Sequence, residues 1–501
     1  MFLLLLLALG VQVLLAGLYQ PAHAAPGNAV AASGAPTAPP RWNIPPGSCY
    51  GPDFSHVTTF PVGANAWGVT VVDLDNDGRV DIASADRGSN SVTVLRNTIT
   101  APGTVSFTLA TSYTVGTQPQ SITSADLDGD GRLELITANY GSNDISVLRN
   151  TSAGPGSITF DAAASFSAEQ GPYSVAAGDL DNDGKPDLAV ADVVNNKASV
   201  LRNATANPGP AAFDSRVDYN VLSGPRSVAV ADLNGDGKAE IVIANSVTGN
   251  VAVLRNKTAG AGSISFDPPL YFETGAGAFS VGIADMDGDG RPDVATVNNV
   301  DNNVSVLRNV ITSTGTITFA ARINVLVAVG GQPFSMSIGD VDEDERPDIV
   351  VGLPDRFEVV VLRNTSGGPG AINFTNFYGF YTGGARPVSV AIADVDGDLK
   401  NDVVTANDNY NNVSVLLNTC ERSPVLTPSS TTSPEPTNTR TATSSSTPTR
   451  DGSPTATSTE TDTPQPTDTA TMTASATRTA TATATGRRPQ MRQRRRPPWQ
   501  H

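Results

Sequence analysis

The sequence predicts an all-β fold, a seven-bladed β-propeller closed by an N-terminal strand, with a disordered C-terminal tail. Three observations predict it: an acidic motif that recurs seven times, four short strand-like runs around each copy, and a spare strand ahead of the first copy. The composition agrees, because 46 Gly, 36 Pro and only 16% charged residues favour short strands joined by turns over long surface helices.

The acidic motif sets the repeat. Its copies read DLDNDGRVD, DLDGDGRLE, DLDNDGKPD, DLNGDGKAE, DMDGDGRPD, DVDEDERPD and DVDGDLKND. They begin at Asp73, Asp126, Asp179, Asp232, Asp285, Asp340 and Asp394, so successive copies are 53 to 55 residues apart. A run such as SVAVA precedes each copy, and runs such as DLAVA, VSVLRN and a segment opening with Phe follow it. Four strands per unit, called A to D, describe a propeller blade; a solenoid is the alternative for any tandem repeat.

Ring closure distinguishes the propeller from the solenoid. Strand D opens with a Phe that lies 19 to 21 residues before the next acidic motif, as Phe107 lies before Asp126. The seventh unit has no strand D after its strand C at 413–418, whereas Phe54 lies 19 residues before Asp73 with no preceding unit. We therefore expect residues 54–62 to pair with the last strand C and to close the ring.

The two cysteines fit this closure. Cys420 follows the last strand C and Cys49 precedes Phe54, so in the closed ring both fall within one C-to-D turn. Positions three apart in a turn can meet the Cα separation of about 5.5 Å that a disulfide needs. We predict a Cys49–Cys420 disulfide, with two unpaired thiols as the alternative.

Composition changes along the chain define its organisation. Residues 1–24 hold an apolar run and a small-x-small site at Ala22 to Ala24, which predicts a signal peptide, although no Lys or Arg precedes the run. An uncleaved anchor is the alternative. Residues 25–48 form a linker, 49–420 the propeller, 421–486 a Ser/Thr/Pro-rich stalk and 487–501 a basic tail. We expect a secreted or cell-surface protein that is not an integral membrane protein, with cell-surface association through the tail as a further hypothesis.

Each acidic loop has the composition of a calcium site. Side-chain oxygens stand at positions 1, 3, 5 and 9, the carbonyl of position 7 adds another, and Gly stands at position 6 in five copies. Calcium takes six to eight oxygens, and several carboxylates offset its charge. The predicted cofactor is Ca²⁺, up to seven ions. The predicted ligands are Asp73, Asp75, Asp77, Arg79 and Asp81; Asp126, Asp128, Asp130, Arg132 and Glu134; Asp179, Asp181, Asp183, Lys185 and Asp187; Asp232, Asn234, Asp236, Lys238 and Glu240; Asp285, Asp287, Asp289, Arg291 and Asp293; Asp340, Asp342, Asp344, Arg346 and Asp348; Asp394, Asp396, Asp398, Lys400 and Asp402.

An EF-hand and polar hairpin turns without metal are the two alternatives to a calcium-binding propeller loop. An EF-hand needs an acid at position 12, where these loops have residues such as Ser84 and Val190 on strand-like flanks. Polar hairpin turns without metal are the second alternative, but their crowded carboxylates would repel one another.

The repeat resembles the FG-GAP or VCBS repeat of the integrin-α-type propeller over roughly residues 49–420. The resemblance implies that the nine-residue loop joins strands A and B on one face and binds calcium. Two copies depart from the pattern, with Glu345 and Leu399 in place of Gly, which makes sites six and seven the weakest predictions. No inserted ligand-binding domain is visible, so the resemblance implies the fold and the metal and not the integrin role.

Charge and composition narrow the function. A net charge of −17 argues against a nucleic-acid partner, and no nucleophile and base stand out in a domain with a single histidine, His56. We therefore expect no enzyme but an extracellular binding, adhesion or scaffold module with a protein or glycan partner. A lectin is the alternative, favoured if pockets recur around the ring, and a propeller-based polysaccharide lyase or hydrolase is the third hypothesis.

A variable position suggests where a partner binds. The residue six before each motif differs from repeat to repeat, whereas the loops hardly vary. Aromatic residues and Arg are typical of binding hot spots. The predicted partner-binding face comprises Trp67, Tyr173, Arg226, Phe279 and Phe334; the alternative is that these side chains only fill the central channel.

Overall fold

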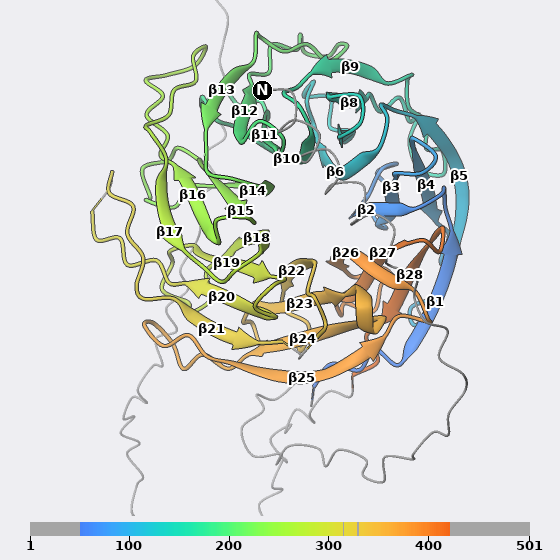
Figure 1. Ribbon diagram of the computed structural model, residues 1–501. Coiled ribbons are helices and arrows are strands. Elements are labelled where there is room, and N and C mark those ends of the chain that lie inside the picture. Colours follow the sequence, from blue (N-terminus) through green and yellow to red (C-terminus); the bar gives the residue numbers. More distant parts are fainter. Residues whose placement is uncertain (1–50, 314, 328–329, 421–501) are drawn as a thin grey trace, which may run out of the picture. The chain divides into compact units, whose positions relative to one another are not determined.

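The computed structural model describes residues 51–313, 315–327 and 330–420, except the side chains of 376–378. The predicted signal peptide, the linker, Cys49 at the start of the predicted propeller, the stalk and the basic tail lie outside the described residues. The described chain forms seven four-stranded antiparallel sheets arranged around a central axis (Figure 1). This arrangement confirms the predicted seven-bladed β-propeller.

Strands A and B form the inner half of each blade. Strand A lies nearest the axis, and its bounds are β2 (Ala66–Val72), β6 (Pro119–Ala125), β10 (Pro172–Gly178), β14 (Pro225–Ala231), β18 (Ala278–Ala284), β22 (Ser335–Gly339) and β26 (Arg386–Ala393). Strand B is buried along its whole length, and its bounds are β3 (Asp81–Asp86), β7 (Glu134–Asn139), β11 (Asp187–Asp192), β15 (Glu240–Asn245), β19 (Asp293–Asn298), β23 (Asp348–Leu353) and β27 (Asp402–Asp408).

Strands C and D form the outer half. Strand C comprises β4 (Ser91–Asn97), β8 (Asp144–Leu148), β12 (Lys197–Leu201), β16 (Asn250–Leu254), β20 (Asn303–Leu307), β24 (Glu358–Asn364) and β28 (Asn412–Leu417). Strand D, on the rim, comprises β5 (Phe107–Thr114), β9 (Ala164–Ser167), β13 (Val217–Asn220), β17 (Leu270–Glu273), β21 (Ile323–Leu326) and β25 (Phe374–Tyr381). A short 3₁₀ helix, η1 (Pro354–Arg356), joins β23 to β24. Within the described ranges, no helix is long and apolar enough to cross a bilayer.

The seventh blade takes its outer strand from the other end of the chain. Strand β1 (His56–Pro61) pairs antiparallel with β28, with His56 opposite Leu417 and Pro61 opposite Asn412. The segment before β1 also docks, because the Thr419 amide donates to the Asp53 carbonyl at 2.8 Å. Cys420 is buried beside this junction, and since Cys49 lies outside the described residues the disulfide stays a prediction.

The hydrophobic core lies between neighbouring blades. One cluster joins Leu74 and Val94 of the first blade to Leu135 and Leu148 of the second, and equivalent clusters recur around the ring. Strand B is buried along its whole length because neighbouring blades cover both faces of each sheet. At the rim, an aromatic residue of strand D meets a Phe of the next blade, as Phe166 meets Phe213 edge-to-face at 4.8 Å between ring centroids.

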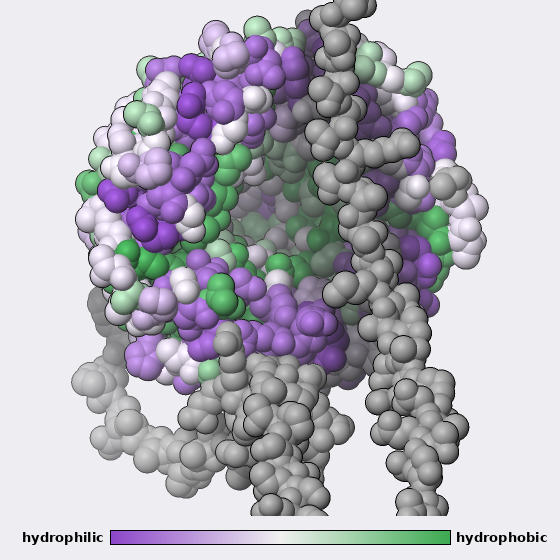
Figure 2. Space-filling model, turned by 180° about the vertical axis from the view of Figure 1, so that it is seen from behind, coloured by the Kyte–Doolittle hydropathy of each residue, from purple (hydrophilic) through white to green (hydrophobic). Residues whose placement is uncertain are grey.

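Antiparallel pairing gives the disc two different faces. The A-to-B and C-to-D connections lie on one face, called here the loop face, which carries the acidic motifs. The B-to-C and D-to-A connections lie on the other, called here the mouth face. Figure 2 shows hydrophilic residues over much of the rim of one face and hydrophobic residues around the hollow at its centre.

Candidate metal centres and the axial channel

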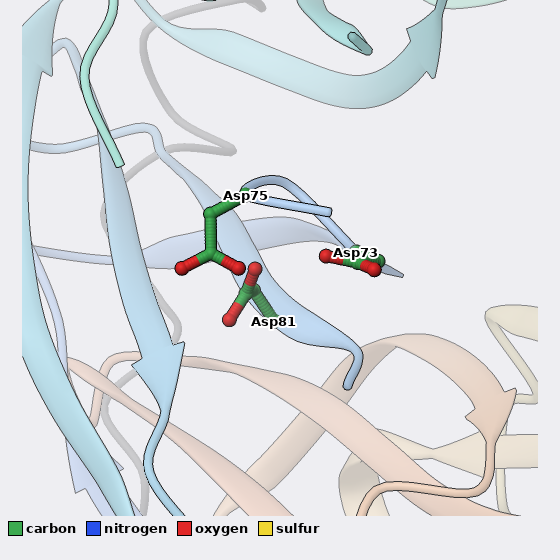
Figure 3. A group of neighbouring side chains, drawn as sticks. All are labelled: Asp73, Asp75 and Asp81. Carbon is green, nitrogen blue, oxygen red and sulfur yellow. The ribbon is translucent and has the colours of Figure 1, made fainter. Parts of the chain in front are cut away.

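The acidic loops bring their carboxylates together. In the first loop, oxygens of Asp73, Asp75 and Asp81 lie within 4.8 Å of one another, with the carboxylates of Asp75 and Asp81 directed toward each other (Figure 3). Equivalent groups form in the second and third loops from positions 1, 3 and 9, and in the fifth and sixth loops from positions 1, 3 and 5. Three of the predicted side-chain ligands therefore converge in each of these five loops.

Position 1 shapes the loop itself. Asp73 accepts hydrogen bonds from the backbone amides of Asp77 at 3.2 Å and Gly78 at 2.8 Å. Gly78 has a φ of +84°, which Gly adopts without strain. Glu345 and Leu399 hold the same left-handed conformation at 65° and 69°, so both departures from the pattern keep the turn despite the cost to a side chain.

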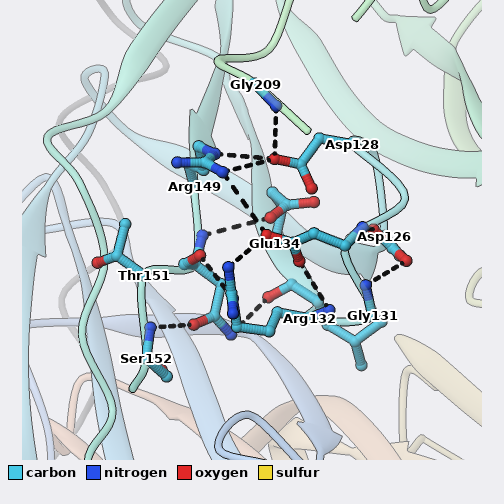
Figure 4. Close-up of polar contacts among 12 residues, drawn as sticks. Asp126, Asp128, Gly131, Arg132, Glu134, Arg149, Thr151, Ser152 and Gly209 are labelled. Atoms are coloured by element: carbon cyan, nitrogen blue, oxygen red, sulfur yellow. Dashed lines mark hydrogen bonds and ion pairs between the residues drawn. The ribbon is translucent and has the colours of Figure 1, made fainter. Parts of the chain in front are cut away.

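Position 3 carries a buried carboxylate in every loop except the fourth, where it is Asn234. Asp128 is 2% exposed, and its Oδ2 accepts bonds from Arg149 at 2.8 Å and from the Gly209 amide of the next blade at 3.1 Å (Figure 4). Its Oδ1 is buried without a hydrogen-bond partner. The same unpartnered Oδ1 occurs at three further copies of position 3, which are Asp75, Asp287 and Asp342.

These unpartnered oxygens are the strongest indication of a cation. A buried carboxylate oxygen with no donor costs about 1–3 kcal/mol or more, so native structures rarely retain one without a partner or an ion. Four equivalent atoms in one chain, each facing a loop of further carboxylates, fit oxygen-coordinated divalent metal. The residues present therefore fit the group that the sequence predicts.

In five of the seven loops, the acid at position 5 pairs with the Arg or Lys side chain at position 7. Arg79 contacts Asp77, Arg132 contacts Asp130 and Lys400 contacts Asp398 at 3.1 Å. The carbonyl of position 7 was the predicted ligand, and in these five loops the structure shows in addition that the side chain of that residue neutralises position 5. Part of the negative charge of the loop is thus balanced within the chain itself.

Position 9 links the loop to strand C. Asp81 accepts the amide of Leu74 at 2.9 Å and that of Asn97 at 2.8 Å. Burial raises the pKa of this carboxyl; the two amide bonds oppose the rise and nearby acids add to it. The raised pKa values of the seven copies are about 6 for Asp187 and Asp293, about 7 for Asp81, Glu134 and Glu240, and about 8 for Asp348 and Asp402. A cation would offset the cost that burial imposes on the ionised form.

The sequence reasoning missed the Arg of strand C. Arg96, Arg149, Arg202, Arg308 and Arg363 each form an ion pair with the position 3 acid of their own blade. Where position 3 is Asn234, the equivalent Arg255 contacts Asp267 instead. In the seventh repeat the Arg is replaced by Leu417. The repeated V-L-R-N run carried this signal, because an Arg that recurs beside acids predicts pairing with them.

The predicted partner-binding residues surround the axis. Trp67 lies 5.6 Å from Phe334, Phe334 lies 4.2 Å from Phe279, and Tyr173 lies 6.1 Å from Phe279 between ring centroids. The guanidinium of Arg226 lies over the rings of both Tyr173 and Phe279. Burial raises the pKa of Tyr173, and contacts with Arg226 oppose that rise. The five side chains thus pack on one another in the channel rather than standing apart on the surface.

Cavities lie on both faces. At the mouth face, a cavity of about 600 Å³ opens over the aromatic ring system and is lined by Trp67, Arg87, Tyr140 and Val194 among others. At the loop face, two equivalent cavities lie between neighbouring blades. One, of about 460 Å³, includes Asp287 and Arg346, and the other, of about 400 Å³, includes Asn234 and Arg291.

Comparisons with known proteins agree with the repeat. The FG-GAP-like repeat family matches residues 73–137, 126–190, 232–296 and 285–351. No curated protein sequence matches the chain. Among solved structures, BBS1N in complex with ARL6DN matches at 14% identity, covering 76% of this chain and 100% of that one, with a TM-score of 0.46. A candidate 6-phosphogluconolactonase from Bacteroides fragilis matches at 16% identity over 65% of this chain and 86% of that one, with a TM-score of 0.47.

Proposed function

This chain is an FG-GAP-repeat β-propeller, and we propose that it is exported, binds calcium in its acidic loops and serves as an extracellular binding or scaffold module. The observation that carries the proposal is the difference in side-chain composition between the two faces of the disc. The loop face holds the carboxylate clusters, whereas the mouth face exposes apolar side chains. Calcium is the metal proposed because the donors are all oxygens and the predicted sets include several carboxylates.

The apolar side chains of the mouth face stand at equivalent positions. Val194, Val247 and Val300 each lie two residues beyond strand B in the third, fourth and fifth blades. Their exposed fractions are 49%, 74% and 66%. Single exposed apolar residues are ordinary, but three at equivalent positions on consecutive blades, of which Val194 lines the mouth-face cavity, support a surface that a partner covers.

Adhesion tests this part of the proposal. Beads coated with the calcium-loaded protein should bind the surface of cells of the producing organism, and the triple variant Val194→Ser, Val247→Ser, Val300→Ser should bind several-fold less. A control triple variant on the outer rim, Leu109→Ser, Val217→Ser, Leu270→Ser, removes apolar residues that are 43–63% exposed and should bind as the wild type does. Equal loss in both variants, or none in the mouth-face variant, contradicts a partner surface at that face. N-terminal sequencing of the secreted chain, with Ala25 first, tests export.

Two equivalent cavities on the loop face favour a second candidate, a carbohydrate-binding propeller. They recur between blades four and five and between blades five and six, which is the pattern that pockets of a lectin would show. A glycan array with the calcium-loaded chain tests it, and a variant with Arg291→Ala and Arg346→Ala should lose any binding that these cavities provide.

A further inference from the structure

We infer that the axial cavity of the mouth face is a binding site for a carboxylate-bearing sugar, a hexuronate, alone or at the end of an acidic glycan. This inference rests on the proposed function only in that the cavity belongs to the face assigned to partners. It differs from the loop-face cavities in its position and in the charge that it presents.

Two guanidinium groups give the cavity its charge. Arg87 lies 4.6 Å above the Trp67 ring, and Arg226 lies 4.6 Å above the Phe279 ring. Neither forms an ion pair with a carboxylate within the described part of the chain, although the protein carries 49 Asp and Glu against 32 Lys and Arg. No acid lines the cavity. A cation stacked on an aromatic ring keeps its N–H edge available, and that edge matches a carboxylate.

Two buried polar atoms among the lining residues lack hydrogen-bond partners. One is a donor, Nε of Arg226, and the other is an acceptor, Oε1 of Gln120, whose residue is 5% exposed. Buried polar atoms of this kind are costly to leave unpaired. A ligand that satisfies both must offer an anionic acceptor and a hydrogen-bond donor, and a sugar acid offers both in its carboxylate and its hydroxyls.

The walls suit a sugar ring. The rings of Trp67, Tyr140 and Phe334 line the cavity, and the phenols of Tyr140 and Tyr173 add further hydrogen-bonding groups. The volume of about 600 Å³ lies within the range of about 300–1,000 Å³ that is usual for small-molecule sites. A cavity of this size accepts one or two sugar residues and not a folded protein segment.

The test titrates the calcium-loaded full chain with sodium glucuronate, observing the tryptophan emission and the saturation-transfer NMR of the sugar. Glucose serves as the neutral analogue, and N-acetyl-glutamate amide serves as an acidic peptide probe. We expect glucuronate to bind and glucose to bind at least tenfold more weakly. Arg226→Gln should weaken glucuronate binding at least tenfold and Gln120→Leu several-fold. The control Arg322→Gln, which changes an exposed Arg just before β21, should leave it unchanged.

Failure of the inference is distinguishable from failure of the proposed function. The melting temperature of each sample with calcium and with chelator is recorded first, and it reports on the loops and on the fold of each variant. A chain that calcium stabilises but that does not bind glucuronate, or binds glucose equally well, overturns the inference alone. Tighter binding of the acidic peptide probe than of glucuronate also overturns the inference. The variant Arg226→Lys keeps the positive charge and so separates loss of the binding site from loss of folding.

Discussion

The side-chain amide of Asn97 donates a hydrogen bond of 2.8 Å to the carbonyl of Val395, and so joins the first blade to the acidic loop of the seventh. Six equivalent Asn residues at the end of strand C make the same bond to the preceding blade, for example Asn203 to Leu127 at 2.9 Å. The seven bonds form an unbroken circle beneath the acidic loops. Each loop is therefore tied both to its own blade and to the next one.

We predict that Asn97→Ala lowers the free energy of unfolding by about 2–3 kcal/mol, because the buried carbonyl of Val395 and the part-buried carbonyl of Val80 lose their donor. Asn203→Ala should lower the free energy of unfolding by the same amount, because its contact between blades three and two has the same form as the contact of Asn97 between blades one and seven. Urea unfolding measures both, with the exposed Asn373→Ala as control, expected within about 0.5 kcal/mol of wild type. If Asn97→Ala left the free energy of unfolding unchanged while Asn203→Ala lowered it, the ring would not be closed as described.

In the fourth loop, a substitution at position 3 should strengthen metal binding. Asn234 donates to Glu240 at 2.9 Å and leaves its own Oδ1 buried without a partner. Asn234→Asp places a second carboxylate against Glu240, so in chelator we expect a loss of about 1–2 kcal/mol from repulsion. In 10 mM calcium the loss should vanish or reverse, since the ion offsets the added charge. Calorimetry in both conditions measures this, and a loss that calcium does not relieve would exclude a cation from this loop.

Backbone strain in the seventh loop is testable without changing any ligand. Leu399 is 81% exposed and has a φ of +69°, a conformation that costs a side-chain residue about 1–2 kcal/mol. Leu399→Gly should therefore raise stability by about 1 kcal/mol after the entropy that Gly loses on folding. The reciprocal Gly78→Leu should lower it by a similar amount, because a Cβ at Gly78 meets no atom within 4 Å and only the strain remains. Denaturant midpoints measure both changes in stability, and changes of the same sign in the two variants would contradict the explanation.

A buried acid away from the loops gives a pH-dependent prediction. Burial raises the pKa of Asp192 from 3.8 to about 7, against a hydrogen bond from Ser199 and the charge of Arg216, while Asp218 and Glu169 add to the rise. The unfolded chain ionises near 4, so the stability associated with this group is full below pH 4 and lost as the pH rises through about 7. Asp192→Asn should thus be more stable than wild type at pH 8 by an amount on the order of 2 kcal/mol, and equal to it at pH 4.

The equivalent Asn139 shows that the new amide has a partner, because its Nδ2 donates to Ser146 at 2.9 Å, and Ser146 corresponds to Ser199. Urea unfolding of both proteins across pH 4 to 8 at constant calcium measures the difference. A stability difference between the two proteins that does not change with pH would show that ionisation of Asp192 does not lower the stability of the wild type.

The repeat pattern predicted most of the fold, because a motif at constant spacing fixes the number of blades and the position of strands A to D. It also predicted which acids share a loop, since side chains two residues apart in a tight turn converge. It did not predict that Trp67, Phe279 and Phe334 stack on one another in the channel, because their distances depend on how blades far apart in sequence meet at the axis. The ion pair between Arg149 and Asp128, 21 residues apart, was also missed, because the V-L-R-N run shows that an Arg recurs while strand register decides which acid it meets.

Calorimetry of the full chain with 10 mM calcium and with excess chelator tests the central claim that the acidic loops bind calcium and stiffen the ring. One site contributes about 2.7 kcal/mol when calcium is at a hundredfold excess over its dissociation constant, so several sites should raise the melting temperature by at least about 10 °C. The account predicts this rise, reduced in proportion when Asp75→Asn and Asp128→Asn remove two of the buried ligands. Identical melting temperatures in calcium and in chelator would contradict it.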